Sequence, residues 1–165
     1  MPRVRIVIGT GSAHPLRMST ATRRLPNRPA QVSVRQVMRR DFVSIHPDEP
    51  VSEAFRLMRF ARLRHLLVVE DGYLVGILSF RDLQEELLSM LSEGPAAKLP
   101  DDSVASAMRA RPYAVTPDTP LRDAAARLCG LRVGCLPVVE RRHTGPALIG
   151  ILTESDLLRA AFETA

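Results

Sequence analysis

Segments with the apolar pattern of a strand alternate along the chain with segments that have the apolar pattern of a helix. Short apolar runs at 42–45 and 113–115 end at a proline, which cannot continue a strand ladder, and they predict brief strands. Each run is followed by an apolar stripe with the spacing of a helix face. The stripes are Val51, Ala54, Phe55 and Met58, and then Leu121, Ala124, Ala125 and Leu128. The chain therefore predicts a strand followed by an amphipathic helix, twice.

Two further apolar strands follow each predicted helix. Asp71-Gly72 joins the first pair as a tight turn, and a longer loop from Arg141 to Gly145 joins the second pair. A last helix closes each unit, and its apolar positions again recur at helical spacing. These positions are Leu83, Leu87 and Leu91 in the first unit and Leu157, Leu158, Ala161 and Phe162 in the second. A short helix around Met38 or Met108 precedes each unit, so the predicted order is β-α-β-β-α.

The same residues recur at a shift of 70 positions. Pro47-Asp48-x-Pro50 matches 117–120, and Leu66-x-Val68-Val69-Glu70 matches 136–140. After four inserted residues the shift becomes 74, where the segment 74–83 matches 148–157. Many matches in the same order indicate a tandem duplication. We expect a first unit over residues 31–92, a linker over 93–102 that begins near Ser92, and a second unit over 103–163.

The charge of the chain is concentrated in its first 30 residues. The net charge is +5, but residues 1–30 contain six arginines and no acid, whereas the rest contains 17 basic and 18 acidic residues. We expect a disordered basic leader, which also resembles a transit peptide, so its place in the mature protein stays open. The nearly neutral body predicts no nucleic-acid partner, although the leader could bind a polyanion weakly. No apolar run approaches the roughly 18 residues of a membrane span, so no membrane partner is expected.

No catalytic or metal-binding set is evident in the sequence. Cys129 and Cys135 lack the paired spacing of a zinc site and form no disulfide framework, so we interpret them as small buried thiols in a reducing cytoplasm. None of His46, His65 and His143 has a serine or cysteine at a sequence position that would suggest a catalytic pair. We therefore expect no enzymatic activity and no required cofactor.

The repeated element order and the ending Gly-Ile-Leu-(Ser/Thr)-x-x-Asp-Leu resemble the CBS (cystathionine β-synthase) domain family. The resemblance covers about residues 31–163 and includes two complete copies. It implies an α/β fold in which two CBS units pack as a pseudo-twofold pair, a Bateman module, with two clefts between them. It also implies adenosine-containing ligands such as AMP, ADP, ATP or S-adenosylmethionine, and a protein partner whose identity the sequence does not give. We expect a homodimer, because apolar helix faces such as Leu83, Leu87 and Leu91 would otherwise be partly bare.

The motifs Ser79-x-x-Asp82 and Thr153-x-x-Asp156 allow two interpretations. A hydroxyl residue followed three positions later by an acid caps a helix without any ligand. At the same place, helix N–H groups attract phosphate and a carboxylate can accept hydrogen bonds from ribose hydroxyls. Spacing alone favours capping, whereas the family resemblance favours a nucleotide cleft.

By position in the family, each cleft uses residues of both copies. The resemblance places Arg40, Leu63 and Arg64 with Thr153 and Asp156 in one cleft. It places Ala110, Val133 and Gly134 with Ser79 and Asp82 in the other, where Arg64 and His65 would meet phosphates through the bidentate fork of arginine and the imidazole. Phe80 and Arg81 lie between Ser79 and Asp82, whereas the second copy has Glu154 and Ser155 there, and the Glu154 carboxylate would repel a polyphosphate.

Three functions follow from these observations. The leading hypothesis is a stand-alone regulatory CBS pair that senses an adenosine-containing ligand and signals to a partner, with the Asp82 cleft as the better nucleotide site. The first alternative is a degenerate CBS pair that serves as a structural or dimerisation module. The second is polyanion binding through the arginine-rich leader.

Overall fold

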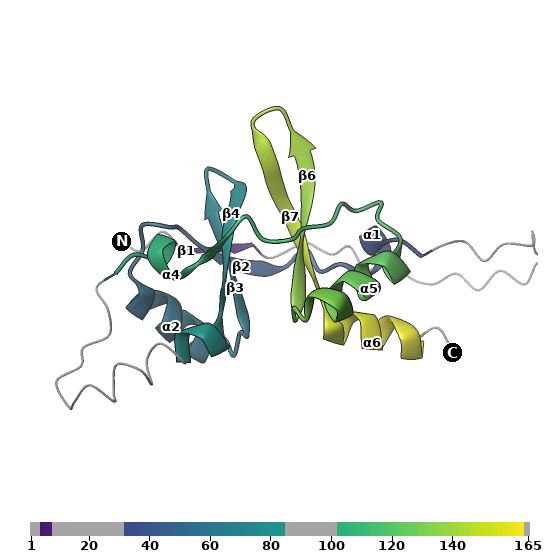
Figure 1. The fold of residues 1–165 in the computed structure, drawn as a ribbon, viewed down its shortest axis with the longest axis horizontal. Coiled ribbons are helices and arrows are strands. Elements are labelled where there is room, and N and C mark those ends of the chain that lie inside the picture. Colours follow the sequence, from purple (N-terminus) through teal and green to yellow (C-terminus); the bar gives the residue numbers. More distant parts are fainter. Residues whose placement is uncertain (1–3, 8–31, 85–101, 164–165) are drawn as a thin grey trace, which may run out of the picture.

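The two sequence copies form two similar halves, which lie side by side in the computed structural model (Figure 1). The structure describes residues 4–7, 32–84 and 102–163. In chain order the elements are β1 (Val4–Val7), α1 (Val34–Val37), β2 (Phe42–Ile45), α2 (Val51–Phe60), β3 (His65–Glu70), β4 (Tyr73–Ser79), α4 (Val104–Ala107), β5 (Arg109–Ala110), α5 (Leu121–Leu131), β6 (Cys135–Arg142), β7 (Gly145–Thr153) and α6 (Glu154–Glu163). Residues 80–84, directly after β4, are also helical. The mixed α/β class with two repeated units is confirmed.

One sheet runs through both halves in the order β1-β2-β3-β4-β7-β6, and β5 pairs with β4. Strand β2 is parallel to β3, whereas β3–β4 and β6–β7 are antiparallel hairpins. The halves join where Tyr73 of β4 pairs with Ala147 of β7. The Tyr73 hydroxyl is also hydrogen-bonded to Oγ1 of Thr144 in the turn between β6 and β7. The sheet is thus continuous, but only the turn ends of the two hairpins pair directly.

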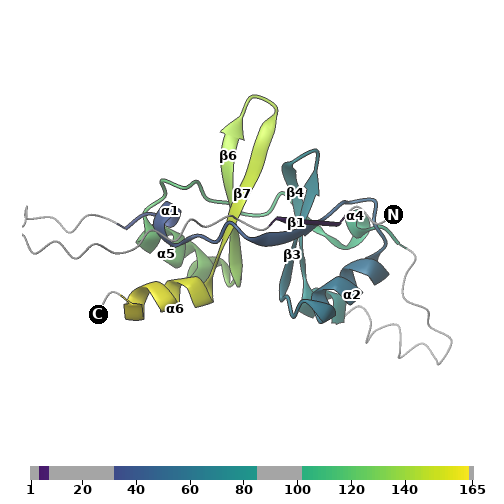
Figure 2. The ribbon, with the colours of Figure 1, turned by 180° about the vertical axis from the view of Figure 1, so that it is seen from behind.

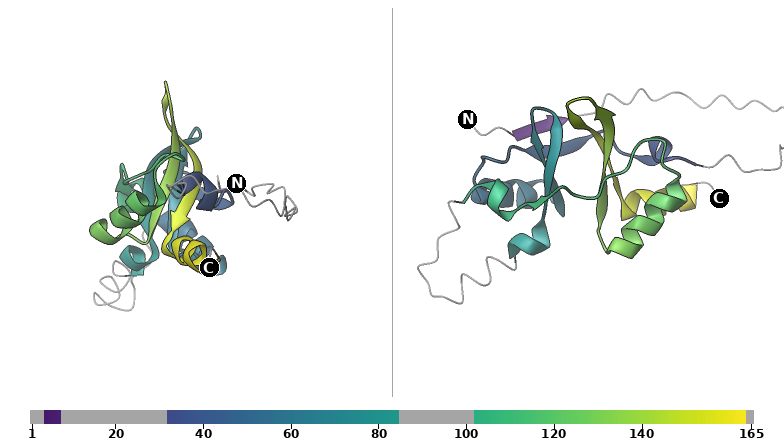
Figure 3. Two further views of the ribbon diagram at one scale, coloured as in Figure 1. Left: turned by 90° about the vertical axis from the view of Figure 1, so that its right-hand side faces the viewer. Right: turned by 45° about the horizontal axis from the view of Figure 1, so that its top comes forward.

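Each half is completed by a segment that precedes the other half in the sequence. We call residues 32–41 the first arm and residues 102–111 the second arm. Val34 and Met38 of the first arm pack in the core of the second half with Leu128 and Leu136. Val104 of the second arm is fully buried in the core of the first half. The chain then crosses between the halves, from α1 to β2 (Figure 2) and from α4 to α5 (Figure 3, right).

Backbone hydrogen bonds hold each arm against the repeated Pro-Asp-x-Pro segment of the other half. The N–H groups of Val34 and Arg35, at the start of α1, donate to the carbonyls of Thr119 (2.9 Å) and Pro117 (2.8 Å). The equivalent bonds of α4 run from Val104 to Glu49 (2.7 Å) and from Ala105 to Pro47 (2.9 Å). The first N–H groups of a helix have no partner within the helix, so these carbonyls satisfy donors that would otherwise be unpaired.

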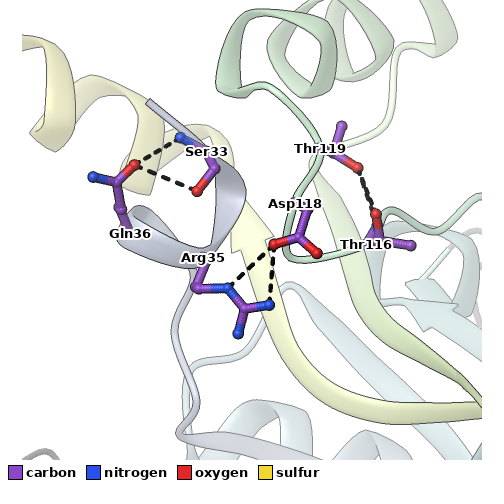
Figure 4. Close-up of polar contacts among 6 residues, drawn as sticks. All are labelled: Ser33, Arg35, Gln36, Thr116, Asp118 and Thr119. Carbon is purple, nitrogen blue, oxygen red and sulfur yellow. Dashed lines mark hydrogen bonds and ion pairs between the residues drawn. The ribbon is translucent and has the colours of Figure 1, made fainter. Parts of the chain in front are cut away.

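Side chains at the start of α1 add contacts that the second arm lacks (Figure 4). The backbone N–H of Ser33 donates to Oε1 of Gln36 (2.9 Å), and the guanidinium of Arg35 forms an ion pair with Asp118 of the second half (3.0 Å). Ala105 is at the position equivalent to Arg35, so no such pair can form at the second arm. The pair is solvent-exposed and contributes at most about 1 kcal/mol, so backbone bonds and core packing dominate the docking of the arms.

Two glycines let the arms approach the sheet closely. A Cβ atom on Gly150 of β7 would lie 2.7 Å from the backbone carbonyl oxygen of Arg39 and 3.3 Å from Sδ of Met38. A Cβ atom on Gly76 of β4 would meet the side chain of Met108, with Cγ at 2.9 Å. Each repeated glycine therefore faces the repeated methionine of the opposite arm. This contact explains why both residue types recur in both copies.

One predicted strand is wrong. The run 113–115 forms no strand, and only Val115 makes an isolated parallel bridge to Val138. In the first half, two residues of β2 pair with Leu67 and Val68 of β3. Pro137 stands where the first half has Leu67, and because proline has no N–H it removes a bond from the ladder. The strand cannot extend beyond the single bridge.

Other differences concern the ends of predicted segments. Val4–Val7 were expected to be disordered, but they form β1, which pairs with β2 in antiparallel register. The open edge of β2 accepts this pairing because its N–H and C=O groups on that side have no other strand. The predicted loop from Arg141 to Gly145 is shorter, since β6 continues to Arg142 and β7 begins at Gly145. The rest of the expected leader from residue 8 and the expected linker 93–101 lie outside the described residues.

The predicted apolar stripes are only partly buried. Leu83 packs in the core of its own half with 3% exposure instead of lying partly bare, and Leu87 and Leu91 lie outside the described residues. On α6, Leu158 and Phe162 are 60% and 77% exposed. Within the described residues, none of the helices has the length and apolarity that would let it cross a membrane.

The glycine contacts generate a stability prediction. Gly150→Ala should lower the free energy of unfolding by about 1–3 kcal/mol, because the added methyl group meets backbone atoms of Arg39 that cannot move without displacing the arm. Urea denaturation measures the loss. Gly130→Ala, within α5, is the matched control, because nothing lies within 4 Å of its added Cβ. That variant should be neutral or more stable by up to about 1 kcal/mol. Equal effects of the two substitutions would contradict the close approach.

Candidate functional site

Two cavities lie between the halves, and residues of both halves line each of them. The larger has a volume of about 580 Å³ and contains Ser79 and Asp82, so we call it the Asp82 cavity. The smaller has a volume of about 370 Å³ and contains Thr153, so we call it the Thr153 cavity. Both volumes fall within the range of small-molecule sites, about 300–1,000 Å³.

Asp82 is exposed, and its carboxylate has no hydrogen-bond donor among the described residues. Ser79 is the last residue of β4, and Asp82 follows in the helical segment 80–84, which Leu83 anchors in the core. Among the described residues, no hydrogen bond or ion pair is made by the Asp82 side chain. Its two oxygens are therefore open to accept hydrogen bonds from a ligand that enters the cavity.

Positive charge surrounds this carboxylate. Four arginines line the Asp82 cavity: Arg64, Arg81, Arg109 and Arg132. Within the described part of the chain, no carboxylate lies within 4.0 Å of the guanidinium nitrogens of Arg64, Arg109 or Arg132. Asp82 is the only acidic residue among those that line the cavity. The site as a whole favours an anion, and arginine suits phosphate because it donates two parallel hydrogen bonds.

The wall of the Asp82 cavity also has an apolar part. Ile77 and Pro137 contribute side chains from the two hairpins, and Val133 and Tyr113 come from loops of the second half. Tyr113 is 64% exposed, so much of its side chain is available to contact a flat ligand group. The cavity therefore combines a basic region with an apolar and aromatic region.

The Thr153 cavity is less positive. Its Arg39 forms an ion pair with Asp41, with 2.8 Å between Nη2 and Oδ2. The hydrogen bond from Arg39 lowers the pKa of Asp41, and the same bond raises the pKa of Arg39. Arg62 and Arg64 are the remaining arginines that line the cavity. With Arg39 neutralised by Asp41, this cavity has fewer charges for a phosphate than the Asp82 cavity.

Asp156 caps a helix instead of lining the Thr153 cavity. Its Oδ2 accepts hydrogen bonds from the backbone N–H of Thr153 (2.9 Å) and from the Thr153 hydroxyl (2.6 Å), and the side chain is 3% exposed. The residue instead lines a groove between α1, α5 and α6. The two motifs have the same spacing, yet in the second copy the carboxylate is occupied within the protein.

The structure brings together most of the residues selected from the sequence. Those that line the Asp82 cavity are Ser79, Arg81, Asp82, Arg64, His65, Val133 and Gly134. Leu63 and Thr153 line the Thr153 cavity, together with Arg64 and His65. Ala110 and Arg40 line neither cavity, whereas their neighbours Arg109 and Arg39 do. In β5, successive side chains of the extended backbone point to opposite sides, so Arg109 and Ala110 cannot face the same cavity.

Sequence reasoning missed several arginines of the two cavities. Arg62 and Arg132 line one cavity each, as do Arg39 and Arg109. Both pairs are related by the shift of 70 positions, and Arg62 and Arg132 share a left-handed backbone with φ 52°. An identical basic residue at a turn in both copies was therefore the signal that would have found them.

His65 and Cys135 are two further groups at these cavities whose pKa is shifted. Burial lowers the pKa of His65 below its ordinary value, as does Arg64, and Asp82 and Glu154 oppose the shift. Burial raises the pKa of the Cys135 thiol to about 12, so this thiol stays protonated and is no nucleophile. Cys129 is exposed, which corrects the expectation that both thiols are buried, since it faces outward on α5. Among the described residues, no cluster of three metal-ligating side chains occurs.

Comparison with known proteins gives a consistent family match. The family model of the CBS domain matches residues 34–89 and 104–163. A CBS domain-containing protein of Dictyostelium discoideum is 32% identical over 133 residues, which cover 78% of this chain and 90% of that protein. An uncharacterised protein of Methanocaldococcus jannaschii is also 32% identical, but the match covers only 28% of its length.

Solved structures agree with this match. The crystal structure of CBSX2 in complex with AMP, a protein of Arabidopsis thaliana, has a TM-score of 0.65 and 31% sequence identity. The match covers 80% of this chain and 97% of that chain. The CBS domain pair of protein MJ0100 superimposes with a TM-score of 0.68 at 19% identity, which is similarity of fold.

The protonation of His65 predicts a pH dependence of stability. The pKa of His65 is lowered in the folded protein and returns to about 6.5 in the unfolded chain, so the unfolded chain binds more protons as the pH falls through this range. The contribution of His65 to the free energy of unfolding is therefore present above about pH 6.5 and is lost as the pH falls below it. Denaturant titrations at about pH 7.5 and 5.5 should show a smaller loss for His65→Gln than for the wild type.

The exposed His143, between β6 and β7, supplies the control. His143→Gln should keep the pH dependence of the wild type. If His65→Gln also keeps it, the imidazole is not held neutral by its surroundings.

Proposed function

The chain belongs to the CBS domain family, and from this premise we propose that it is a regulatory CBS pair that senses an adenine nucleotide in the Asp82 cavity. The single observation that carries the proposal is that one cavity between the halves is lined by four arginines and by Asp82, whose carboxylate makes no hydrogen bond or ion pair among the described residues. Ligand binding between two halves can shift their relative arrangement, which a protein partner can detect.

The chemistry of the cavity fits each part of such a ligand. Asp82 would accept hydrogen bonds from the ribose hydroxyls, as a carboxylate has two acceptor oxygens. The arginines would bind phosphate, and the apolar wall near Val133 and Tyr113 would contact the purine. The AMP complex of CBSX2, at 31% identity, supports an adenine nucleotide as the class of ligand.

The charge of the cavity narrows the set of ligands. AMP, ADP and ATP carry phosphates that the arginines can neutralise. S-adenosylmethionine carries a sulfonium cation, which four arginines repel, so we rank it below the nucleotides for this cavity. No cofactor is required for such binding.

We assign no enzymatic reaction to the chain. The Cys135 thiol at the cavity is held protonated by burial, and the neighbouring histidine is not paired with a nucleophile among the described residues. The role that remains is recognition of a ligand. The free thiols Cys129 and Cys135 suit a reducing compartment, and we propose the cytoplasm as the location.

Self-association is part of the proposal. Phe60, Leu158 and Phe162 expose 92%, 60% and 77% of their surfaces on α2 and α6. Figure 1 shows these two helices on the same side of the molecule, away from the turns of the hairpins. Exposed large apolar side chains favour an interface, and a homodimer that contacts these two helices would cover them.

Matched aspartate variants test the ligand site. Asp82→Ala should weaken binding of AMP, ADP or ATP by roughly ten- to a hundredfold, because a charged acceptor of ribose hydroxyls is lost. Asp156→Ala should leave affinity nearly unchanged and lower the free energy of unfolding by about 1 kcal/mol, because it removes a helix cap. Calorimetry measures the first effect and urea denaturation the second.

Each other outcome points to a different conclusion. Wild-type protein that binds none of the three nucleotides would be a degenerate CBS pair with a structural role. Equal affinity of the wild type and Asp82→Ala would show that the carboxylate does not contact the ligand. A larger loss of affinity in Asp156→Ala than in Asp82→Ala would contradict the assignment of the ligand to the Asp82 cavity.

A further inference from the structure

The Asp82 cavity and the Thr153 cavity share part of their walls. Three residues line both: Arg64, His65 and Gly134. His65 lies directly against Gly134, since a Cβ atom on this glycine would be 2.6 Å from Cε1 of the imidazole. The imidazole and this glycine thus separate two cavities that belong to opposite halves of the repeat.

The shared wall contains only one arginine for both cavities. Gly134 occupies the position in the second copy that Arg64 occupies in the first, and Cys135 occupies the position of His65. A pair with two identical copies would have one basic residue of this kind for each cavity. In this chain only the first copy has an arginine at this position, and this arginine lines both cavities.

The two cavities depend on Arg64 to different degrees. Besides Arg64 and Arg81, the Asp82 cavity has Arg109 and Arg132, which have no carboxylate within 4.0 Å among the described residues. The Thr153 cavity has Arg62 and Arg39, and Arg39 is already paired with Asp41. An anion in the Asp82 cavity therefore neutralises the guanidinium of Arg64. The Thr153 cavity loses more by this, because it has fewer other arginines that could bind an anion. The anion in the Asp82 cavity also places a negative charge across a wall only one imidazole thick, where like charges repel.

Resting on the proposed function, we propose that the two cavities bind anionic ligands with negative coupling, because Arg64 serves one anion at a time. Filling the Asp82 cavity weakens the binding of a phosphate-bearing ligand in the Thr153 cavity, by at least about fivefold if the coupling lies in the usual range for linked sites. The chain then holds one nucleotide tightly and a second only weakly. The Thr153 cavity acts as the site that responds to the state of the other.

The repeat offers a matched pair of variants for the test. Arg132 lines only the Asp82 cavity and Arg62 only the Thr153 cavity, and the two have the same backbone conformation at equivalent positions. Replacement by Gln removes the charge and changes the backbone preference equally in both variants. Thermal melting of both variants verifies that they fold before binding is compared.

Calorimetric titration of the full chain with AMP measures the coupling. In the wild type we expect two binding steps, a tight one in the Asp82 cavity and a weak one in the Thr153 cavity. Arg132→Gln should weaken the tight step and strengthen binding in the Thr153 cavity at least about fivefold over the wild-type weak step, although the variant has lost a positive charge. Adding Arg62→Gln should remove that strengthened step, which assigns it to the Thr153 cavity. In a protein that already carries Arg64→Gln, the additional substitution Arg132→Gln should no longer strengthen AMP binding in the Thr153 cavity.

The remaining outcomes are distinguishable. Two steps in the wild type, with the weak step unchanged or weaker in Arg132→Gln, would overturn the coupling and leave the proposed function intact. If the wild type shows one step and Arg132→Gln reveals no step that is sensitive to Arg62→Gln, the coupling is also overturned. No AMP binding by the wild type, with ADP and ATP likewise inactive, would overturn both proposals.

Discussion

The close approach of each arm to the sheet of the opposite half is the constraint on which the structure depends. Met38 reaches over Gly150, and Met108 reaches over Gly76, because neither glycine has a Cβ to hold the arm away. Each arm then places a valine in the core of the other half and gives its first helix N–H groups to a repeated Pro-Asp-x-Pro segment. The cavities follow from the same contact, since Arg39 and Arg109 enter them from the docked arms.

Local elements could be predicted from the sequence, whereas the partners of these elements could not. Periodicity placed the strand Phe42–Ile45 and the helix beginning at Val51, because their apolar positions alternate with the geometry of the element. The crossing of the arms depends on contacts between residues far apart in the chain, which no local pattern records. The failure at Tyr113 had the same origin, since the residue that prevents the strand, Pro137, is on the neighbouring strand.

The candidate site shows how duplication can preserve a motif and divide its role. Asp82 and Asp156 have the same spacing from a hydroxyl residue, and the sequence allowed capping or ligand binding for both. The structure gives capping to Asp156, which Thr153 engages through two hydrogen bonds, and leaves Asp82 open beside basic side chains. The sequence could identify the motif and the cleft it faces, but the direction of each carboxylate depends on tertiary packing. The sequence selected Arg40 and Ala110, whereas their neighbours Arg39 and Arg109 line the cavities, since the side to which each arm residue points also depends on tertiary packing.

The exchange of arms also bears on how such a chain could originate. In each repeat the arm docks on the body of the other copy and not on its own. Two separate copies of an ancestral repeat would complete each other as a symmetric pair of chains, a domain-swapped dimer. Fusion of the copies makes the same docking intramolecular, at an effective concentration that reaches the millimolar range for short flexible links. Once the copies are joined, each can change on its own, and symmetry no longer requires both cavities to recognise the same molecule.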